Sequence, residues 1–324
     1  MSGETLRRAV VLMNLGGPDS LMAVRPFLYN LFSDPAIIRL PAVLRLPLAW
    51  LIAARRAPIA REIYAYLGGA SPLLANTEVQ ARALEAELGP GYRCFIAMRY
   101  WHPLTEEACS AVKAWQPDEI TLVPLYPQFS KTTTGSSLAA WNREAKRQDL
   151  ETRRKFVTGY HRASGFIATM AEAITEALDR RSARGEEVRL LFSAHGLPVR
   201  LARAGDPYPA QVEETAQAIV DALARPGLDW RLCYQSRVGP LQWLGPAVED
   251  EITRAGREHV AVVIAPISFV SEHSETLVEL DRDYRRQAEA SGVPTYCRVP
   301  TVGTDPRFIR ALADCVRSAA AAEE

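Results

Sequence analysis

The stretch "VAVVIAPISFVSEHSETLVELDRDY", residues 260–284, combines the pattern that decides the fold with a candidate site. Its first part, 260–269, is a nearly continuous apolar run, which is typical of a strand buried on both faces of a parallel sheet. The second part places His273 ahead of three acidic residues spaced four apart, Glu275, Glu279 and Asp283. On a helix this spacing brings the three carboxylates onto one stripe.

The acidic stripe has two interpretations. Like charges four residues apart repel each other on an isolated helix, but the neighbouring Arg282, Arg285 and Arg286 are spaced to pair with acidic residues. The first interpretation is therefore a solvated helix face, the usual explanation for a run of charges. The second is a line of oxygen ligands or proton carriers directed into a cleft.

Six more apolar, β-rich runs occur along the chain, and helical patterns separate most of them. We expect strands at 9–15, 93–100, 119–126, 154–160, 188–195, 231–236 and 260–269, and helices at 76–88, 104–115, 165–181, 210–224 and 308–323. This alternation predicts an α/β fold with parallel sheets covered on both faces. The strands are too many for one small sheet. We therefore expect two doubly wound, Rossmann-like domains, 1–150 and 151–324, with the last helix placed to cross back onto the first.

The composition argues against several classes of protein. The chain has 324 residues with 38 basic and 38 acidic side chains, so its charge gives no basis for nucleic-acid binding. The five cysteines are scattered, without a CxxC pair or a zinc-type spacing, which indicates reduced thiols in a cytoplasmic protein. The N-terminal segment lacks the features of a secretory signal peptide.

The most membrane-like stretch is 36–54, "AIIRLPAVLRLPLAWLIAA". Two arginines and two prolines within it argue against a transmembrane helix. Two alternatives stay open. In the first, the stretch is an apolar surface lip that touches a membrane or an apolar ligand. In the second, it is an ordinary core helix.

Two histidines are expected at the carboxyl ends of strands, where open α/β folds bind their ligands. His195 ends the strand 188–195, and His273 follows the strand 260–269. A histidine beside a carboxylate suits proton abstraction near neutral pH, and it also suits a divalent metal such as iron. The alternative is a loop histidine that satisfies backbone groups.

Other segments offer groups for binding a substrate. A hydroxyl-rich segment, 126–137, and the segment 235–246, with Ser236 and the large ring of Trp243, both follow strands. An aromatic wall beside a histidine and a carboxylate suggests a flat, apolar substrate.

These segments, in their order and spacing, resemble the ferrochelatase family over nearly the whole chain. The resemblance is carried by "NLGGPDS", "ARRAP", "GGASPL", "RYWHPLTEE", "YPQFSKTTTGSS", "SAHGLP", "QSRVGPLQWLGP" and "SEHSETLVELD". It implies two Rossmann-like domains with a porphyrin cleft between them. It also implies insertion of ferrous iron into protoporphyrin IX, the last step of haem biosynthesis, with release of two protons.

The resemblance also implies roles for individual residues. His195 and Glu275 would be catalytic and would bind the metal, and Glu279 and Asp283 would continue the acidic path as further metal ligands. Residues implied to contact the porphyrin are Arg56, Tyr64, Ser71, Arg99, Tyr100, Tyr126, Ser236, Trp243 and His273.

The sequence departs from many family members in ways that affect cofactors and partners. Some relatives hold a [2Fe–2S] cluster with cysteines, most of them in a C-terminal extension. Here the chain ends soon after Cys315, and Lys131 stands where those members have another cysteine. We therefore expect Fe²⁺ as a substrate, no permanently bound cofactor, and a monomer. It would be cytoplasmic, with 36–54 able to contact the inner face of the cytoplasmic membrane.

Two rival functions stay open from the sequence. One is a chelatase for coproporphyrin or another tetrapyrrole. The other is a porphyrin or haem carrier without catalysis, which the same fold could also support.

Overall fold

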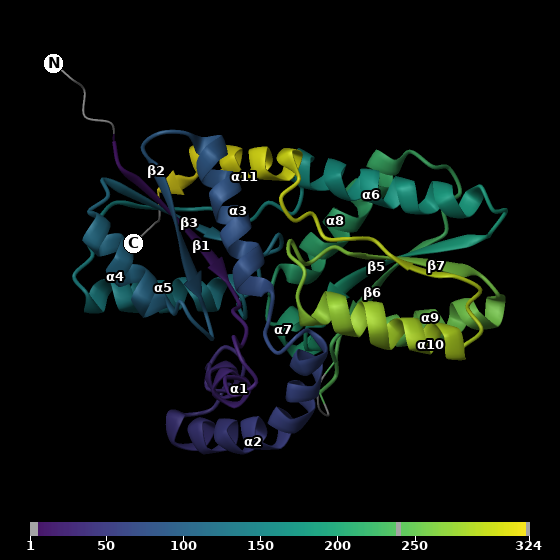
Figure 1. The fold of residues 1–324 in the computed structure, drawn as a ribbon, viewed down its shortest axis with the longest axis horizontal. Helices are drawn as coiled ribbons and strands as arrows, with labels where there is room; N and C mark the ends of the chain where they lie inside the picture. Colours follow the sequence, from purple (N-terminus) through teal and green to yellow (C-terminus); the bar gives the residue numbers. More distant parts are fainter. Residues whose placement is uncertain (1–5, 238–240, 322–324) are drawn as a thin grey trace. The chain divides into compact units, whose positions relative to one another are not determined.

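The computed structural model describes residues 6–237 and 241–321, which form two compact units. One unit comprises the chain up to Gly159 together with the segment from Ile309, and the other comprises Tyr160–Phe308. Each unit contains one sheet built around parallel strands (Figure 1). The predicted α/β class with two parallel sheets is therefore confirmed.

The sheet of the first unit has the strand order β2-β1-β3-β4-β9. The strands are β1 (Arg8–Asn14), β2 (Tyr92–Met98), β3 (Glu119–Pro124), β4 (Arg154–Phe156) and β9 (Ala320–Ala321). The first four pair in parallel, and β9 joins the edge in the antiparallel direction. The interior strand β1, which pairs with β2 and β3, is buried on both faces, as its continuous apolar sequence predicts.

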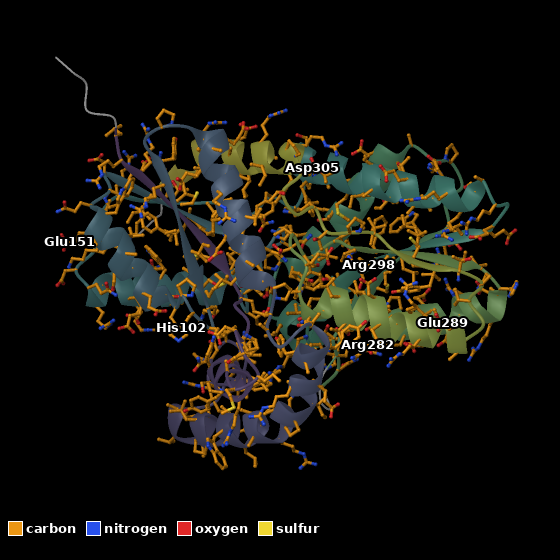
Figure 2. The ribbon with its side chains drawn as sticks, in the orientation of Figure 1. His102, Glu151, Arg282, Glu289, Arg298 and Asp305 are labelled. Atoms are coloured by element: carbon orange, nitrogen blue, oxygen red, sulfur yellow. The ribbon has the colours of Figure 1, made fainter. Side chains whose placement is uncertain are left out.

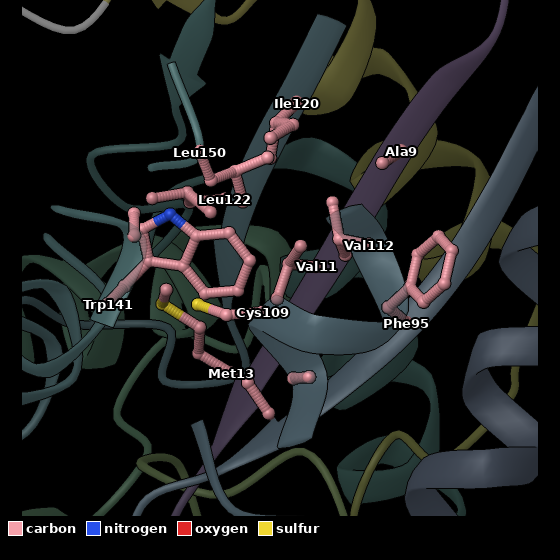
Figure 3. Packing of buried hydrophobic residues seen from close by; sticks show 13 residues of the cluster. Ala9, Val11, Met13, Phe95, Cys109, Val112, Ile120, Leu122, Trp141 and Leu150 are labelled. Carbon is pink, nitrogen blue, oxygen red and sulfur yellow. The ribbon is translucent and has the colours of Figure 1, made fainter. Parts of the chain in front are cut away.

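The helices of this unit are α1 (Val24–Phe32), α2 (Ala42–Tyr66), α3 (Leu73–Leu88), α4 (Thr105–Trp115), α5 (Thr134–Arg147) and most of α11 (Pro306–Ser318). Helices α1 and α2 pack on each other in a cluster of their own. Figure 1 shows α4 and α5 on one face of the sheet and α3 on the other. The fully buried Trp141 of α5 packs with Cys109 of α4 and Val11 of β1 in a core cluster of this unit (Figure 3).

The sheet of the second unit is all parallel, in the order β6-β5-β7-β8. Its strands are β5 (Val188–His195), β6 (Trp230–Gln235), β7 (Ala261–Pro266) and β8 (Tyr296–Arg298). Its helices are α6 (Ser164–Ser182), α7 (Val199–Arg203), α8 (Tyr208–Leu223), α9 (Val248–Glu258), the π-helix η1 (Glu275–Asp283) and α10 (Tyr284–Ala290). Figure 1 shows α6 and α8 on one face, and α9 and α10 on the other.

The stretch 36–54 lies largely in the first half of α2, and its large apolar side chains are at the surface. Val43 is 80% exposed, and Trp50 and Leu51 are each 57% exposed. Small residues such as Ala49 and Ala53 form the buried side of the helix instead. Of the two alternatives left open by the sequence, the structure supports the surface lip. No helix within the described ranges is long and apolar enough to cross a bilayer.

Candidate active site

His195 lies at the carboxyl end of β5, next to the end of β6. The following residue, Gly196, makes this close approach possible, since a Cβ there would lie 2.7 Å from the carbonyl oxygen of Gln235 and 3.2 Å from the Trp243 ring. The backbone carbonyl of His195 accepts a hydrogen bond of 3.0 Å from the buried Tyr208 hydroxyl. The backbone of His195 is thus fixed, while its side chain stays 43% exposed.

The two ring nitrogens of His195 have different partners. Nδ1 lies 2.7 Å from the carbonyl oxygen of Gly196, which can only accept, so Nδ1 is the donor. In the neutral ring Nε2 then carries a lone pair. Nε2 lies 3.6 Å from Oε2 of Glu275, too far for a direct hydrogen bond. Two electron-rich atoms that face each other at this separation favour a proton or a metal cation between them.

Glu275 and Glu279 lie on η1, where the amide of Tyr284 donates to the carbonyl of Glu279, five residues earlier. The helix expected here is present, but with π geometry. Such segments are rare and are frequent at functional sites. Glu279 accepts from four donors: the hydroxyl of Ser236 at 2.6 Å, its backbone N–H at 2.9 Å, the Tyr284 hydroxyl at 2.9 Å and Gln235 Nε2 at 3.3 Å. Burial, and then the charge of Glu275, raise the pKa of Glu279.

Ser236 links the two carboxylates. Its Oγ lies 2.6 Å from Oε2 of Glu279 and 3.1 Å from Oε2 of Glu275. A serine hydroxyl has one proton, so it can donate to only one of these carboxylates at a time. The other contact is a hydrogen bond only when that carboxyl group itself carries a proton. Ser236 has a left-handed backbone, with φ of 59°, which directs both its N–H and its hydroxyl toward Glu279.

His273 is close to this site but buried. It is 7% exposed, and its Nδ1 donates to the carbonyl of Ser271 at 3.0 Å. Burial lowers its pKa below the ordinary histidine value, which favours a neutral ring. The ring of Phe269 lies near both histidines, with its centroid 6.4 Å from that of His195 and 4.6 Å from that of His273.

The third carboxylate of the stripe is arranged differently. Asp283 is 44% exposed and pairs at 2.7 Å with Arg282, so it does not share the partners of Glu275 and Glu279. Within the residues that the structure describes, no three His, Cys, Asp or Glu side chains converge as a metal site. The structure therefore brings together His195, Glu275, Glu279 and Ser236, and leaves Asp283 on the solvated side.

The first unit contains a second carboxylate cluster, centred on the buried Asp34. Its Oδ2 accepts hydrogen bonds from Arg99 Nη2 at 2.7 Å, from the Tyr100 hydroxyl at 2.8 Å and from Ser136 Oγ. Its Oδ1 accepts from the amide of Ala36 at 2.8 Å. Burial alone would raise the pKa of Asp34, but the hydrogen bond from Ser136 and the charge of Arg99 outweigh it and lower the pKa.

The remaining residues expected at the substrate lie as follows. Tyr100 is 1% exposed, and burial raises its pKa well above the ordinary value. Tyr64 belongs to the buried cluster between α1 and α2. The guanidinium of Arg56 lies 5.8 Å from the ring centroid of Phe32. Tyr126 follows β3, Ser71 accepts from the amide of Leu73 at 3.3 Å, and Trp243 packs against the backbone of Gly196.

Several residues of the two clusters were missed from the sequence: Asp34, Ser136, Gln235 and Tyr284. Asp34 had one usable signal, because a single acidic residue in the apolar segment "LFSDPAII" must find partners if it is buried. Gln235 and Tyr284 had none, since an ordinary strand residue and an ordinary helix residue give no sign that they meet at one carboxylate.

Known proteins resemble this chain in sequence and in fold. A model of the ferrochelatase family matches residues 7–320. A ferrochelatase of Caulobacter vibrioides is 54% identical over 97% of this chain and 90% of its own length. A ferrochelatase of Phenylobacterium zucineum is 52% identical over 97% of this chain and 92% of its own length. The solved structure of SirB from Bacillus subtilis with Fe³⁺ has a TM-score of 0.54 and 14% identity, and it covers 96% of this chain and 95% of that one. At that identity the likeness shows a shared fold.

Proposed function

The chain belongs to the ferrochelatase family, and we propose that it inserts ferrous iron into protoporphyrin IX at the pair formed by His195 and Glu275. The observation that carries the placement is the geometry of this pair. The lone pair of Nε2 faces a carboxylate oxygen 3.6 Å away, and the opposite side of the ring is fixed by Gly196. The protein is an enzyme of the chelatase type, and iron is its substrate.

Metal insertion requires a base, because two pyrrole protons must leave the porphyrin as the metal enters. A neutral imidazole accepts a proton near neutral pH, and a neighbouring carboxylate stabilises the imidazolium that results. The same two groups are also suitable ligands for a divalent metal before transfer. We propose that His195 and Glu275 perform this exchange and that Glu279, linked to Glu275 through Ser236, takes protons onward. Asp283 is proposed as the outer end of this acidic path.

The porphyrin contacts proposed for the first unit are Arg56, Tyr64, Ser71, Arg99, Tyr100 and Tyr126, and those for the second unit are Ser236, Trp243 and His273. A porphyrin tilted against the Trp243 ring would expose its nitrogen lone pairs, so that binding energy is used for a distortion resembling the transition state. We further propose that the protein holds no [2Fe–2S] cluster, since Lys131 stands where cluster-bearing relatives have a cysteine. We also propose that it is a monomer.

We propose that the exposed apolar side chains of α2 contact the membrane surface from the cytoplasm. Val43, Leu44, Trp50, Leu51 and Ile59 are each at least 57% exposed on this one helix. The apolar surface also favours protoporphyrin over the more polar coproporphyrin. Co-sedimentation with lipid vesicles checks the membrane contact. We expect the wild type to sediment with the vesicles and a W50S/L51S variant to do so less. If vesicles sediment neither protein, the membrane contact is contradicted.

The decisive experiment is anaerobic insertion of Fe²⁺ into protoporphyrin IX, followed by porphyrin absorbance, with coproporphyrin III in parallel. We expect turnover with protoporphyrin that falls by about 10²- to 10⁴-fold in His195→Ala, the range for loss of a catalytic base. Porphyrin binding by the variant should be largely kept. Binding spectra without turnover of either porphyrin by the wild type would contradict the enzyme assignment and favour a carrier.

A further inference from the structure

Arg298, at the end of β8, joins two acidic residues that flank the candidate active site in sequence. Its Nη1 lies 2.9 Å from Oε1 of Glu272, and its Nη2 lies 2.9 Å from Oδ2 of Asp281. The Arg298 side chain is only 10% exposed. Figure 2 shows it beside the helix that carries η1 and α10. One buried guanidinium thus bridges the segment before η1 and η1 itself.

The two bridged residues lie on either side of the reacting carboxylates. Glu272 is three residues before Glu275, and Asp281 is two residues after Glu279. Glu272 is further fixed by the amide of Thr301 at 2.9 Å. We call this bridge from Arg298 to Glu272 and Asp281 a clamp. Because it holds the chain on both sides of Glu275 and Glu279, it restricts translation and rotation of the helix that carries them.

A second contact from β8 holds the same helix. The Tyr296 hydroxyl donates at 2.7 Å to the backbone carbonyl of Leu280, within η1. Tyr296 and Arg298 are two residues apart on β8, and they hold adjacent residues of η1, Leu280 and Asp281. The strand therefore contacts η1 through two hydrogen-bonding side chains at one place.

The π geometry of η1 gives such a clamp a purpose. Runs of i→i+5 hydrogen bonds are rare and usually confined to a single turn, so we expect a nine-residue π-helix to depend on contacts from its surroundings. Reversion to α geometry would change the number of residues per turn and so rotate Glu279 relative to Glu275. Glu279 would then leave Ser236, and Glu275 would no longer face Nε2 of His195.

We propose that Arg298 is a positioning residue that holds η1 in its π geometry and so keeps Glu275 and Glu279 directed at His195 and Ser236. The inference rests on the proposed function for its catalytic consequence, but its structural part can be measured alone. The planar fork of arginine holds two carboxylates in fixed directions, whereas the ammonium group of lysine is a point charge on a flexible stem. Arg298→Lys therefore keeps the charge and removes the fixed geometry of the clamp.

The second unit offers a matched control in Arg189. This arginine is 7% exposed and also bridges two acidic residues, Asp229 at 2.7 Å and Glu258 at 2.6 Å. It lies near the amino end of β5, six residues before His195, which is about 20 Å along a strand. Arg189→Lys thus makes the same chemical change in a similar buried bridge, away from the site.

The experiment measures kcat, the KM for Zn²⁺ and the KM for protoporphyrin, together with amide hydrogen exchange over residues 275–283. For Arg298→Lys we expect kcat to fall by at least about tenfold, since small misplacement of reacting groups is costly. The KM for Zn²⁺ should rise, the KM for protoporphyrin should stay within about twofold, and exchange in η1 should accelerate. Tyr296→Phe, a milder change, should shift the same quantities in the same direction by less.

Three results would overturn the proposal. One is an unchanged kcat and unchanged exchange in Arg298→Lys. Another is full activity in Arg298→Lys with loss only in Arg298→Met, which would show that charge alone matters. The third is an equal loss in Arg189→Lys, which would indicate a general effect on stability. Failure of the wild type to insert metal would contradict the proposed function, and the hydrogen exchange over η1 would still decide whether Arg298 positions the helix.

Discussion

Each unit of this protein buries a carboxylate cluster, and the two clusters differ in whether a cation stabilises the negative charge. Asp34 in the first unit accepts four hydrogen bonds, one of them from the cation Arg99, and its pKa is lowered. Among the residues that the structure describes, the donors to Glu279 in the second unit are all neutral. Glu279 shares the Ser236 hydroxyl with Glu275 and has a raised pKa.

The difference separates a structural carboxylate from one suited to proton transfer. A carboxylate held by a buried cation and several donors keeps its charge and its position. A pair of carboxylates that compete for one hydroxyl proton is ready to take another proton or a cation. Perturbed carboxyl groups are therefore informative about function only when the direction of the shift and its cause are known.

The largest expected effect is on catalysis, from Glu275→Gln. This change removes the anion that faces Nε2 of His195 while keeping its shape, so turnover should fall by about 10²- to 10⁴-fold. Because the Glu275 side chain is 24% exposed and its nearest ion-pair partner, His195 Nε2, lies 3.6 Å away, the free energy of unfolding should change by less than about 1 kcal/mol. Steady-state Fe²⁺ insertion and chemical denaturation check the two parts. A large loss of stability would place Glu275 with Asp34 as a structural group.

The next effect is on stability, from Asp34→Asn. The neutral amide leaves Arg99 without its buried anion and cannot accept from all four donors. The free energy of unfolding should therefore fall by roughly 2–4 kcal/mol. Urea denaturation measures it, and Asp283→Asn is a suitable control, because the Asp283 side chain is 44% exposed and its ion pair with Arg282 is screened by solvent. Equal stability losses in the two variants would contradict the structural role of the Asp34 cluster.

The smallest expected effect is on how stability depends on pH, and it has opposite signs in the two clusters. The pKa of Glu279 is raised in the folded protein. Its contribution to stability is therefore fully present at a pH below the ordinary pKa of glutamate, and it is lost as the pH rises through the pKa of the folded state. The thermal stability of Glu279→Gln relative to wild type should therefore improve as the pH rises from about 4.5. The pKa of Asp34 is lowered in the folded protein, so its ionised form stabilises the fold at a pH above the ordinary pKa of aspartate. This stabilisation is lost as the pH falls, so the difference in stability between wild type and Asp34→Asn should shrink below about pH 3.8. Parallel pH profiles for the two variants would contradict the comparison.

The sequence predicted the sheets better than the helices between them. Val188–His195 and the other buried strands were found because continuous apolar runs have few alternatives in an α/β chain. Helix α5 was missed because its start, "TGSS", is rich in hydroxyls, and such residues are also typical of loops. Helix α9 could have been found, since Val248, Ile252 and Ala255 follow helical spacing. The short strands β8 and β9 have too few residues to form a pattern.

The sequence predicted the site in part, and its limits have a physical reason. A strand end and a four-residue spacing are local features, and they predicted His195 and a stripe of Glu275, Glu279 and Asp283. The structure places Glu275 and Glu279 beside Ser236, and Asp283 pairs with Arg282 instead. The π geometry of η1 and the contact with Ser236, about 40 residues earlier, depend on tertiary packing. The same applies to Asp34, whose side-chain partners are 65 to 102 residues away.

The central claim, that the two clusters differ in their affinity for a proton, is tested most directly by infrared difference spectroscopy of the carboxyl C=O stretch during a pH titration. Glu279→Gln and Asp34→Asn would assign the bands. We predict that a protonated carboxyl band persists above pH 4.5 in the wild type and in Asp34→Asn, and is lost in Glu279→Gln. A persistent band that instead disappears in Asp34→Asn, or that is unchanged in Glu279→Gln, would contradict the account.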